Sequence, residues 1–211
     1  MSHLIKFAIL GFGHIGKRHA KMIFENKEAE LVAICDVLSR SELEISEFKN
    51  IPFYKNIDEL LQSDIKFDVV CVCTPNGLHA QQSIQLLNNG FHVVCEKPMA
   101  LTKKECEKVI LASKKVSKYV FCVMQNRYSP PSKWLKKIIT ENILGEIYIV
   151  HVNCFWNRDE RYYQHSTWRG TKDLDGGTLF TQFSHFIDTI YWLFGDLTIN
   201  SAEFRDFNHK N

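Results

Sequence analysis

Gly11-Phe12-Gly13-His14-Ile15-Gly16 follows directly on the apolar run at residues 4–10 and opens a helical pattern over residues 15–25. Glycines at these spacings let a chain turn tightly after a buried parallel strand, and they let a phosphate approach the N-terminus of the next helix. Asp36 ends the next apolar run, where an acid can accept hydrogen bonds from an adenosine ribose. The stretch predicts a dinucleotide-binding strand–turn–helix unit, and the alternative is a glycine-rich turn that serves only packing.

Composition and charge are those of an ordinary soluble globular protein. Apolar residues make up 45% and charged residues 24% of the 211 residues. The formal net charge of +2 and the lack of a basic stripe argue against nucleic acid or an anionic membrane as a partner. Because the N-terminal apolar stretch is too short for a cleaved signal peptide, and no run reaches membrane-spanning length, we expect a cytoplasmic protein.

The seven cysteines predict neither a disulfide framework nor a zinc site, because their number is odd and they include no CxxC pair. Cys35, Cys95 and Cys122 end or line apolar runs, where a reduced cysteine serves as a small hydrophobic residue. We expect buried thiols and no bound metal.

Strand-like and helix-like runs alternate from residue 4 to about residue 125. The strand-like runs are residues 4–10, 31–35, 69–73, 93–95 and 119–124, and the helical patterns between them are residues 15–25, 40–48, 57–62, 78–89 and 102–115. Near-continuous apolar strands are typical of a parallel sheet covered on both faces. Residues 1–125 therefore predict an α/β domain, a Rossmann-type doubly wound sheet that binds ligands at the carboxyl ends of its strands.

The pattern changes in residues 126–211, which predict part of an α+β domain with an open sheet. A short helix over residues 133–140 is followed by an alternating run at residues 146–156, which predicts a strand with one exposed face. The later elements are a loop over residues 157–177, an apolar helix over residues 179–194 and a strand-like run at residues 199–204. Two strands leave a sheet edge uncovered, so we expect a fragment or a homo-oligomer that pairs through this sheet.

Lys97 lies where a strand-like run meets its loop, between Glu96 and Pro98. This edge of a doubly wound sheet faces the nicotinamide end of a dinucleotide, so Lys97 could hydrogen-bond a substrate hydroxyl and assist its deprotonation. Partial burial would lower the pKa of the amine and suit it to that role. A surface lysine before a loop proline is the alternative.

The helix predicted over residues 179–194 carries a polar stripe formed by Thr181, Gln182, His185 and Asp188. Histidine titrates near neutrality and can take a hydroxyl proton, so His185 is a candidate base. A core histidine with a satisfied partner is the alternative.

The loop over residues 157–177 is polar, aromatic and rich in arginine. Its side chains that suit an anionic sugar nucleotide are Arg158, Arg161, Tyr162, Tyr163, Trp168 and Arg169. A guanidinium group matches carboxylate and phosphate through its planar fork, and aromatic faces stack on sugars or bases. A solvated loop with a few anchoring aromatic residues is the alternative.

These motifs resemble the family of glucose–fructose oxidoreductase, inositol dehydrogenase and the rhizopine-catabolism protein (Gfo/Idh/MocA). The matching segments are Gly11 to His19, Thr74-Pro75-Asn76 with His79, Glu96-Lys97-Pro98, and Gly176-Gly177 followed by His185-Phe186-Ile187-Asp188. The resemblance implies a nicotinamide-dependent oxidoreductase of a sugar or cyclitol, with Lys97 and His185 as catalytic residues and a cis bond before Pro98. Family members often carry an aspartate where this chain has Thr181, and they continue well past residue 211.

Finer details are similar to one branch, the UDP-N-acetyl-2-amino-2-deoxyglucuronate 3-dehydrogenases of bacterial surface polysaccharide synthesis, which oxidise the C3 hydroxyl of a UDP-linked N-acetylglucosaminuronate. The similarity rests on Gln125-Asn126-Arg127-Tyr128, Trp156-Asn157-Arg158, Tyr162-Tyr163, Trp168-Arg169-Gly170-Thr171 and Gln182. It implies NAD as the cofactor, since Asp36 would repel the 2′-phosphate of NADP, although Arg40 nearby acts against that preference. The alternatives are an oxidoreductase of a free sugar or inositol, and a truncated dinucleotide-binding protein without catalysis.

Residue by residue, the resemblance implies two sets of contacts. The cofactor set is Gly11, Phe12, Gly13, His14, Ile15, Gly16, Asp36, Thr74, Pro75, Asn76, His79, Glu96, Lys97 and Gln125. The substrate set is Lys97, Arg127, Asn157, Arg158, Tyr162, Trp168, Arg169, Thr181, Gln182 and His185.

Overall fold

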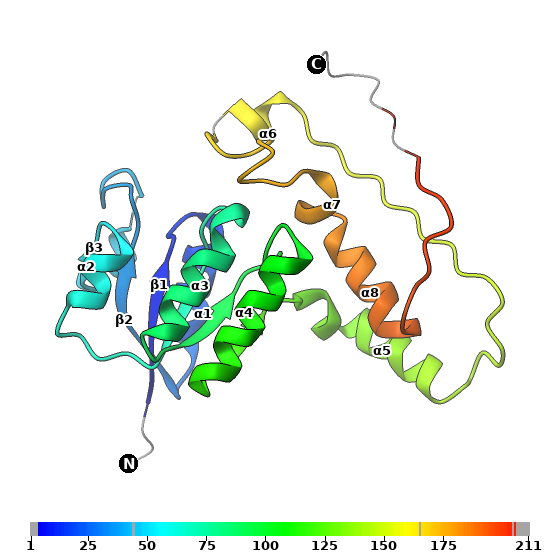
Figure 1. Ribbon diagram of the computed structural model, residues 1–211, viewed down its shortest axis with the longest axis horizontal. Helices are drawn as coiled ribbons and strands as arrows, with labels where there is room; N and C mark the ends of the chain where they lie inside the picture. The colour runs from blue at the N-terminus through cyan, green and yellow to red at the C-terminus, as the bar shows by residue number, and fades with distance from the viewer. Residues whose placement is uncertain (1–3, 44, 165, 204, 206–211) are drawn as a thin grey trace. The chain divides into compact units, whose positions relative to one another are not determined.

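The computed structural model describes residues 4–43, 45–164, 166–203 and 205. The chain forms two compact units. Figure 1 shows the chain coloured from the N-terminus to the C-terminus. The first unit contains Met1–Val123 and Cys154–Ser184, and the second contains Met124–Asn153 and His185–Asn211. The assignment of domains to residues 1–125 and 126–211 stays a prediction.

The first unit is built on a six-stranded sheet with the order β3-β2-β1-β4-β5-β6. Its strands are β1 (Ile5–Leu10), β2 (Ala29–Cys35), β3 (Phe53–Tyr54), β4 (Val69–Val72), β5 (His92–Cys95) and β6 (Val120–Cys122), and every neighbouring pair is parallel. The strand order reverses between β1 and β4, which is where a doubly wound sheet opens a crevice for a ligand. The predicted Rossmann-type fold is confirmed.

Helices cover both faces of this sheet, which explains why its strands are mostly apolar. Alternate residues of β1 pack into different hydrophobic cores on the two faces of the sheet. Ile9 packs with Ala20 and Ile23 of α1 (His14–Glu25). Ala8 and Leu10 pack instead in the core that holds buried residues of α2 (Ile57–Gln62), α3 (His79–Asn88) and α4 (Lys103–Val116). Side-chain caps fix two of these helix starts, with Thr102 accepting from Glu105 N–H and Asn56 from Glu59 N–H.

The segment between β2 and β3 differs from the prediction. The helix expected over residues 40–48 is wrong, since its described part is a turn followed by a short 3-10 helix at Ser46–Phe48. Ser39 and Glu42 hydrogen-bond each other locally, a pattern that competes with helix formation. The two-residue strand β3 was not predicted, because its only sequence signal is a short apolar pair after Pro52.

The late apolar helix also differs from the prediction, because it is interrupted. It forms α7 (Thr178–Thr181) and α8 (Ser184–Phe194), separated by Gln182 and Phe183. Phe183 N–H bonds back to Thr178 O at 2.9 Å, which closes α7 as a helix end. The loop predicted before it holds one short helix, α6 (Glu160–Gln164).

The second unit contains α5 (Pro130–Thr140) and the rest of α8. The strand predicted at residues 146–156 is wrong, because that run is extended but pairs with no strand in the described part of the chain. Residues 199–203 are likewise unpaired, and Phe204 of that expected strand lies outside the described residues. A strand needs a neighbour to satisfy its backbone groups, and neither run finds one. Ile147–Val152 instead line a shallow groove with Ile190, Phe194 and Leu197.

The predicted sheet of residues 126–211 therefore does not form among the residues described, and pairing of copies through it stays a prediction. None of the helices in the described ranges is both long and apolar enough to cross a membrane. Cys35 and Cys95 are buried, as predicted, and burial raises the pKa of each thiol to about 12. Cys122, also expected to be buried, is only half-buried.

Candidate active site

The glycine motif forms the turn between β1 and α1. Gly11 has φ +89°, and a Cβ there would lie 2.7 Å from the backbone of Cys73 at the end of β4. A Cβ on Gly16 would lie 2.1 Å from the carbonyl oxygen of Gly11. Gly13, in contrast, has open space around its Cα and begins α1 without a side-chain cap. Two glycines therefore allow close backbone packing, and the third leaves the helix N-terminus open to a ligand.

Asp36 lies directly beyond β2 and contacts the glycine turn. Its Oδ2 accepts from Phe12 N–H at 2.6 Å and its Oδ1 from Leu38 N–H at 2.8 Å. A carboxylate oxygen can accept more than one hydrogen bond, so both oxygens keep capacity for ribose hydroxyls. These two hydrogen bonds hold the Asp36 carboxylate at the edge of the glycine turn.

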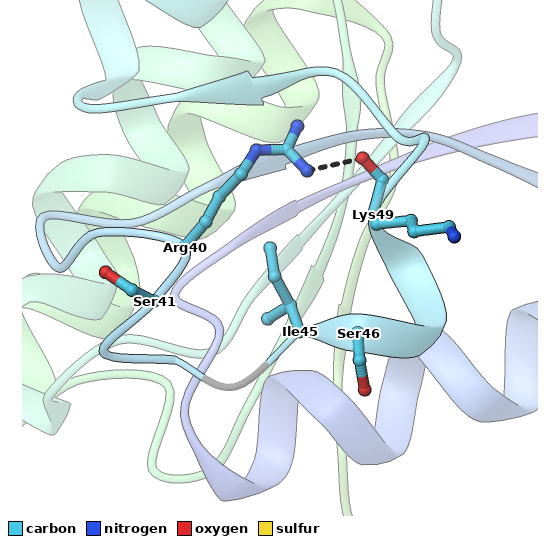
Figure 2. Close-up of a pocket in the computed structure, with 5 residues that line it drawn as sticks. All are labelled: Arg40, Ser41, Ile45, Ser46 and Lys49. Atoms are coloured by element: carbon cyan, nitrogen blue, oxygen red, sulfur yellow. Dashed lines mark hydrogen bonds between the residues drawn. The ribbon is translucent and has the colours of Figure 1, made fainter.

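Arg40 is engaged with backbone near Asp36. One guanidinium nitrogen donates to Lys49 O at 2.8 Å and the other to Ile51 O, and the group lies 5.3 Å from the ring centroid of Phe53. Figure 2 shows the first of these bonds beside a shallow pocket, whose lining residues are Arg40, Ser41, Ile45, Ser46 and Lys49. These bonds occupy two of the five donors that could otherwise attract a 2′-phosphate.

The loop after β4 is held by a buried histidine. His79 is 1% exposed, and its ring nitrogens lie 2.7 Å from Pro98 O and 2.7 Å from Thr74 O. Burial lowers the pKa of this imidazole, and the two carbonyls act in the opposite direction. His79 therefore ties the loop after β4 to the loop after β5, and Pro75 caps the short 3-10 turn at Asn76–Leu78 that leads to His79.

The loop after β5 carries Glu96 and Lys97. Glu96 is 9% exposed, and its Oε1 lies 2.7 Å from Nε2 of His19, which lies on α1. Lys97 is half-buried and donates from Nζ to Thr181 O at 2.5 Å. Desolvation by burial lowers the pKa of Lys97, as the sequence predicted. The Lys97–Pro98 bond is cis, which confirms that expectation.

Arginine and aromatic side chains of the loop over residues 157–177 stack on one another. The guanidinium carbons of Arg158 and Arg169 lie 4.4 Å and 4.3 Å from the ring centroid of Tyr162. Arg158 also lies over Trp156 at 4.7 Å, and Arg169 over Trp168 at 5.6 Å. The Nε atoms of both arginines are buried and find no hydrogen-bond partner among the described residues. Such an arrangement places two cations against one ring and leaves them donors for an anion.

Three more residues of the substrate set belong to the same unit. Gln182 is 6% exposed and donates to the Tyr162 hydroxyl at 3.4 Å. Thr181 donates from Oγ1 to Gly177 O at 3.0 Å and supplies the carbonyl that Lys97 contacts. Asn157 is exposed. Eight of the ten predicted substrate residues thus belong to this unit, where Lys97 donates to Thr181 O and Gln182 to the Tyr162 hydroxyl.

Gln125, Arg127 and His185 belong to the second unit. His185 is 8% exposed, and its Nε2 lies 3.4 Å from Nε2 of Gln125. Arg127 donates to both carboxylate oxygens of Asp188, from Nε at 2.8 Å. That His185 acts on the same substrate atoms as Lys97 stays a prediction.

Asp175 is a polar residue that sequence reasoning passed over, because it was treated only as part of a turn. It is 4% exposed, and Asn76 donates from Nδ2 to its backbone oxygen at 2.8 Å. This bond engages the amide of Asn76, which belongs to the predicted cofactor set. In the sequence, Asp175 stands directly before two glycines. This pattern indicates a tight turn, but it does not indicate that the carboxylate is buried.

Sequence profiles of known families match both parts of the chain. The profile described as the oxidoreductase family with an NAD-binding Rossmann fold covers residues 5–123. The chain belongs to the Gfo/Idh/MocA oxidoreductase family. The profile of the family's C-terminal domain covers residues 133–211. The family, the fold and the cofactor class predicted from the sequence are confirmed.

Solved structures and curated relatives are similar to this chain. The WlbA dehydrogenase from Chromobacterium violaceum, in complex with NADH and UDP-GlcNAcA, is 36% identical with a TM-score of 0.86, over 92% of this chain and 56% of that one. The WlbA dehydrogenase from Bordetella pertussis is 34% identical with a TM-score of 0.87, over the same shares. D-glucoside 3-dehydrogenase of Escherichia coli K12 is 27% identical over 96% of this chain and 58% of its own length. The Gfo/Idh/MocA chain described here spans somewhat more than half the length of these relatives.

The residues present fit NAD. Gly13 leaves the start of α1 free of a side chain, and a Cβ there would enter the space that a pyrophosphate needs. Asp36, which accepts from Phe12 N–H, provides at the end of β2 the carboxylate with which this fold binds a ribose. Glu96 and Lys97 stand at the carboxyl end of β5, the edge of the sheet at which this fold binds its ligands.

Proposed function

We propose that this protein oxidises the C3 hydroxyl of a UDP-linked N-acetylglucosaminuronate with NAD, as a step in bacterial surface polysaccharide synthesis. The observation that carries the proposal is the half-buried Lys97 at the end of β5, in the same compact unit as the Arg158–Tyr162–Arg169 stack. The solved WlbA dehydrogenases, which bind UDP-GlcNAcA, support this choice of substrate.

The stack suits an acidic substrate for an electrostatic reason. Arg158 and Arg169 keep buried Nε–H groups without protein acceptors in the described part of the chain. A carboxylate or diphosphate would satisfy these donors and neutralise both cations, whereas a neutral sugar would leave them uncompensated. Substrate charge would therefore contribute more to binding here than in a relative that acts on inositol.

Lys97 and His185 are assigned the proton chemistry. The lowered pKa of Lys97 brings its amine closer to the neutral form, which can accept a hydroxyl proton. His185 is the second candidate for that proton, because an imidazole titrates near neutral pH. NAD, when bound, accepts the hydride from the carbon that carries the hydroxyl.

A second candidate function is oxidation of a free sugar or inositol. The relatives that favour it are D-glucoside 3-dehydrogenase and inositol 2-dehydrogenase, at 27% and 28% identity. The two functions differ in the role of Arg158 and Arg169. An acidic substrate offers an anionic group for these cations to bind, whereas a neutral sugar offers none.

The test is NADH formation, followed at 340 nm, with UDP-N-acetylglucosaminuronate, UDP-N-acetylglucosamine, glucose and myo-inositol. Turnover of the uronate alone supports the proposal, and turnover of a free sugar supports the second candidate. Arg158→Met should raise KM for the uronate about tenfold, the loss of one charged hydrogen bond. Lys172→Met removes an exposed cation of the same loop and should change KM little. A folded chain that binds NAD without any turnover would overturn both functions.

A further inference from the structure

Glu96 carries a carboxylate that lies between two hydrogen-bond donors. Its Oε1 lies 2.7 Å from Nε2 of His19, and its Oε2 accepts from Lys97 N–H at 3.3 Å. An ionised carboxylate only accepts hydrogen bonds, so Nε2 of His19 is the donor in the first contact. Both side chains are mostly buried, and a buried carboxylate is costly unless donors compensate it. The two donors therefore fix how the Glu96 side chain lies.

The helix α1 brings His19 to this carboxylate. Gly16 stands three residues before His19 and packs closely on the glycine turn, because a Cβ on Gly16 would lie 2.1 Å from Gly11 O. Ala20, the residue after His19, is buried in the core between α1 and the sheet. Residues three apart share one face of a helix, so His19 lies on the side of α1 that faces the sheet.

The backbone at Glu96 and Lys97 is held where β5 ends. Glu96 N–H donates to Val72 O at 3.0 Å, which extends the pairing of β5 with β4 by one residue. Lys97 follows immediately, and the acceptor of its N–H is the Glu96 carboxylate. From this point its side chain reaches α7, where Nζ donates to Thr181 O. The Glu96 carboxylate therefore holds the backbone from which the Lys97 amine extends.

A continuous path joins the glycine turn to Lys97. Gly13 begins α1, α1 carries His19, and His19 contacts the carboxylate that accepts from Lys97 N–H. Gly13, His19, Glu96 and Lys97 all belong to the first compact unit. The helix that presents its N-terminus to a cofactor is thus hydrogen-bonded, through one histidine, to the residue that precedes Lys97.

We propose that His19 is a positioning residue for Lys97, which acts by holding the Glu96 carboxylate against the Lys97 amide. Without His19, one oxygen of Glu96 loses its donor, and the side chain can turn away from Lys97 N–H to find another. The inference rests on the proposed function only in that Lys97 is the acting group there. The state of the Lys97 amide can be measured without any turnover.

The experiment compares two substitutions of the same chemistry and different length. In His19→Gln the side-chain amide nitrogen can take the place of Nε2 and donate to Glu96, whereas in His19→Asn it ends one bond short. Arg18→Asn is the matched control, because it places the same side chain at an exposed position of the same helix.

The measured quantity is the rate at which Lys97 N–H exchanges with deuterium, followed by NMR in chains labelled with nitrogen-15 lysine. Lys97→Arg identifies the signal by removing it. Lys118 N–H, which donates to Ser113 O at 3.1 Å in the same unit, is the reference for opening of the whole unit.

We expect Lys97 N–H to exchange about tenfold faster in His19→Asn than in the wild type, with the Lys118 rate unchanged. His19→Gln and Arg18→Asn should keep both rates within about twofold of the wild type. With a sugar that the wild type oxidises, kcat should fall about tenfold in His19→Asn and KM should change little, because Lys97 acts on bound substrate. If His19→Asn does not fold, His19→Ala replaces it, with the same expected results.

An unchanged Lys97 exchange rate in a folded His19→Asn or His19→Ala variant would overturn the inference. So would an equal acceleration of Lys97 and Lys118, which would mean that His19 only stabilises the unit. An equal acceleration in His19→Gln or Arg18→Asn would also overturn it, because the reach of the side chain at position 19 would then not matter. Failure of the proposed function appears differently, as no NADH from any sugar while the Lys97 exchange rates still differ.

Discussion

Gly13 and Gly16 of the motif differ in the space around them, and this difference predicts opposite effects for the same substitution. A Cβ on Gly16 would lie 2.1 Å from Gly11 O and 3.4 Å from a methyl carbon of Ile9, so α1 would have to move away from β1. A Cβ on Gly13 meets nothing within 4 Å, and its φ of −67° is one that alanine adopts readily. Gly16→Ala should therefore damage the fold, and Gly13→Ala should damage only cofactor binding.

The magnitudes follow from these contacts. Forcing a methyl group against backbone costs about 3 kcal/mol of unfolding free energy, which for a chain of this size lowers the melting temperature by about 9 °C. Gly13→Ala should leave the melting temperature unchanged or raise it slightly, because alanine restricts the unfolded chain. The added methyl group stands where a pyrophosphate must approach the start of α1, so the Kd for NAD should rise about tenfold or more.

Two assays separate the outcomes. Thermal unfolding followed by circular dichroism gives the stability of each variant, and isothermal titration calorimetry gives the Kd for NAD at a temperature at which all are folded. A Gly16→Ala variant as stable as the wild type would refute the packing argument. A Gly13→Ala variant that binds NAD as tightly as the wild type would refute the argument about the open helix start.

Three further outcomes are expected. Asp36→Ser should raise the affinity for NADP relative to NAD, because it removes a negative charge that repels the 2′-phosphate. The same ratio of Kd for NADP to Kd for NAD in the variant and the wild type would contradict this prediction. Asp188→Asn should destabilise the chain by about 2 kcal/mol, because the Arg127 guanidinium loses its bidentate carboxylate partner, which raises the pKa of Arg127. An unchanged urea midpoint would contradict this prediction. Burial lowers the pKa of His79 from 6.5 in the folded chain, so just below pH 6.5 the unfolded chain binds more protons than the folded chain does. The free energy of unfolding should therefore fall as the pH decreases from about 7 to 5.5. In the His79→Gln variant, the urea midpoint should depend less on pH over this range. If it depends on pH as strongly as in the wild type, groups other than His79 cause the effect.

The fold of the first unit was predictable because its central strands are covered on both faces. Such strands are mostly apolar, and the helices between them begin with readable caps such as Thr102 with Glu105. The helix expected at residues 40–48 failed because local hydrogen bonds of Ser39 and Glu42 compete with helical ones, a competition that apolar spacing does not report.

The strand expected at residues 146–156 failed for a different reason. Alternating apolar residues indicate that one face can be buried, but a strand also needs a neighbour, and periodicity within one segment carries no information about that.

The candidate site was predictable where a motif determines the backbone. The glycine turn, Asp36 and Lys97 lie where their spacing placed them, at the carboxyl ends of β1, β2 and β5. Asp175 was not predictable, because its importance comes from contacts with residues about a hundred positions earlier, such as Asn76. Two residues so far apart acquire a relation only through the completed fold.

The bond between Asn76 and Asp175 has a consequence for how the protein is made. A hydrogen bond across 99 positions closes late, because loops of that length are slow to form. While the chain is being synthesised, Gly77 N–H and the Asn76 amide must wait for residues 174 and 175 to leave the ribosome before they gain these partners. A nucleotide-binding fragment cut at residue 123 would keep those groups permanently without them. Anyone who expresses that domain alone should therefore append residues 154–184.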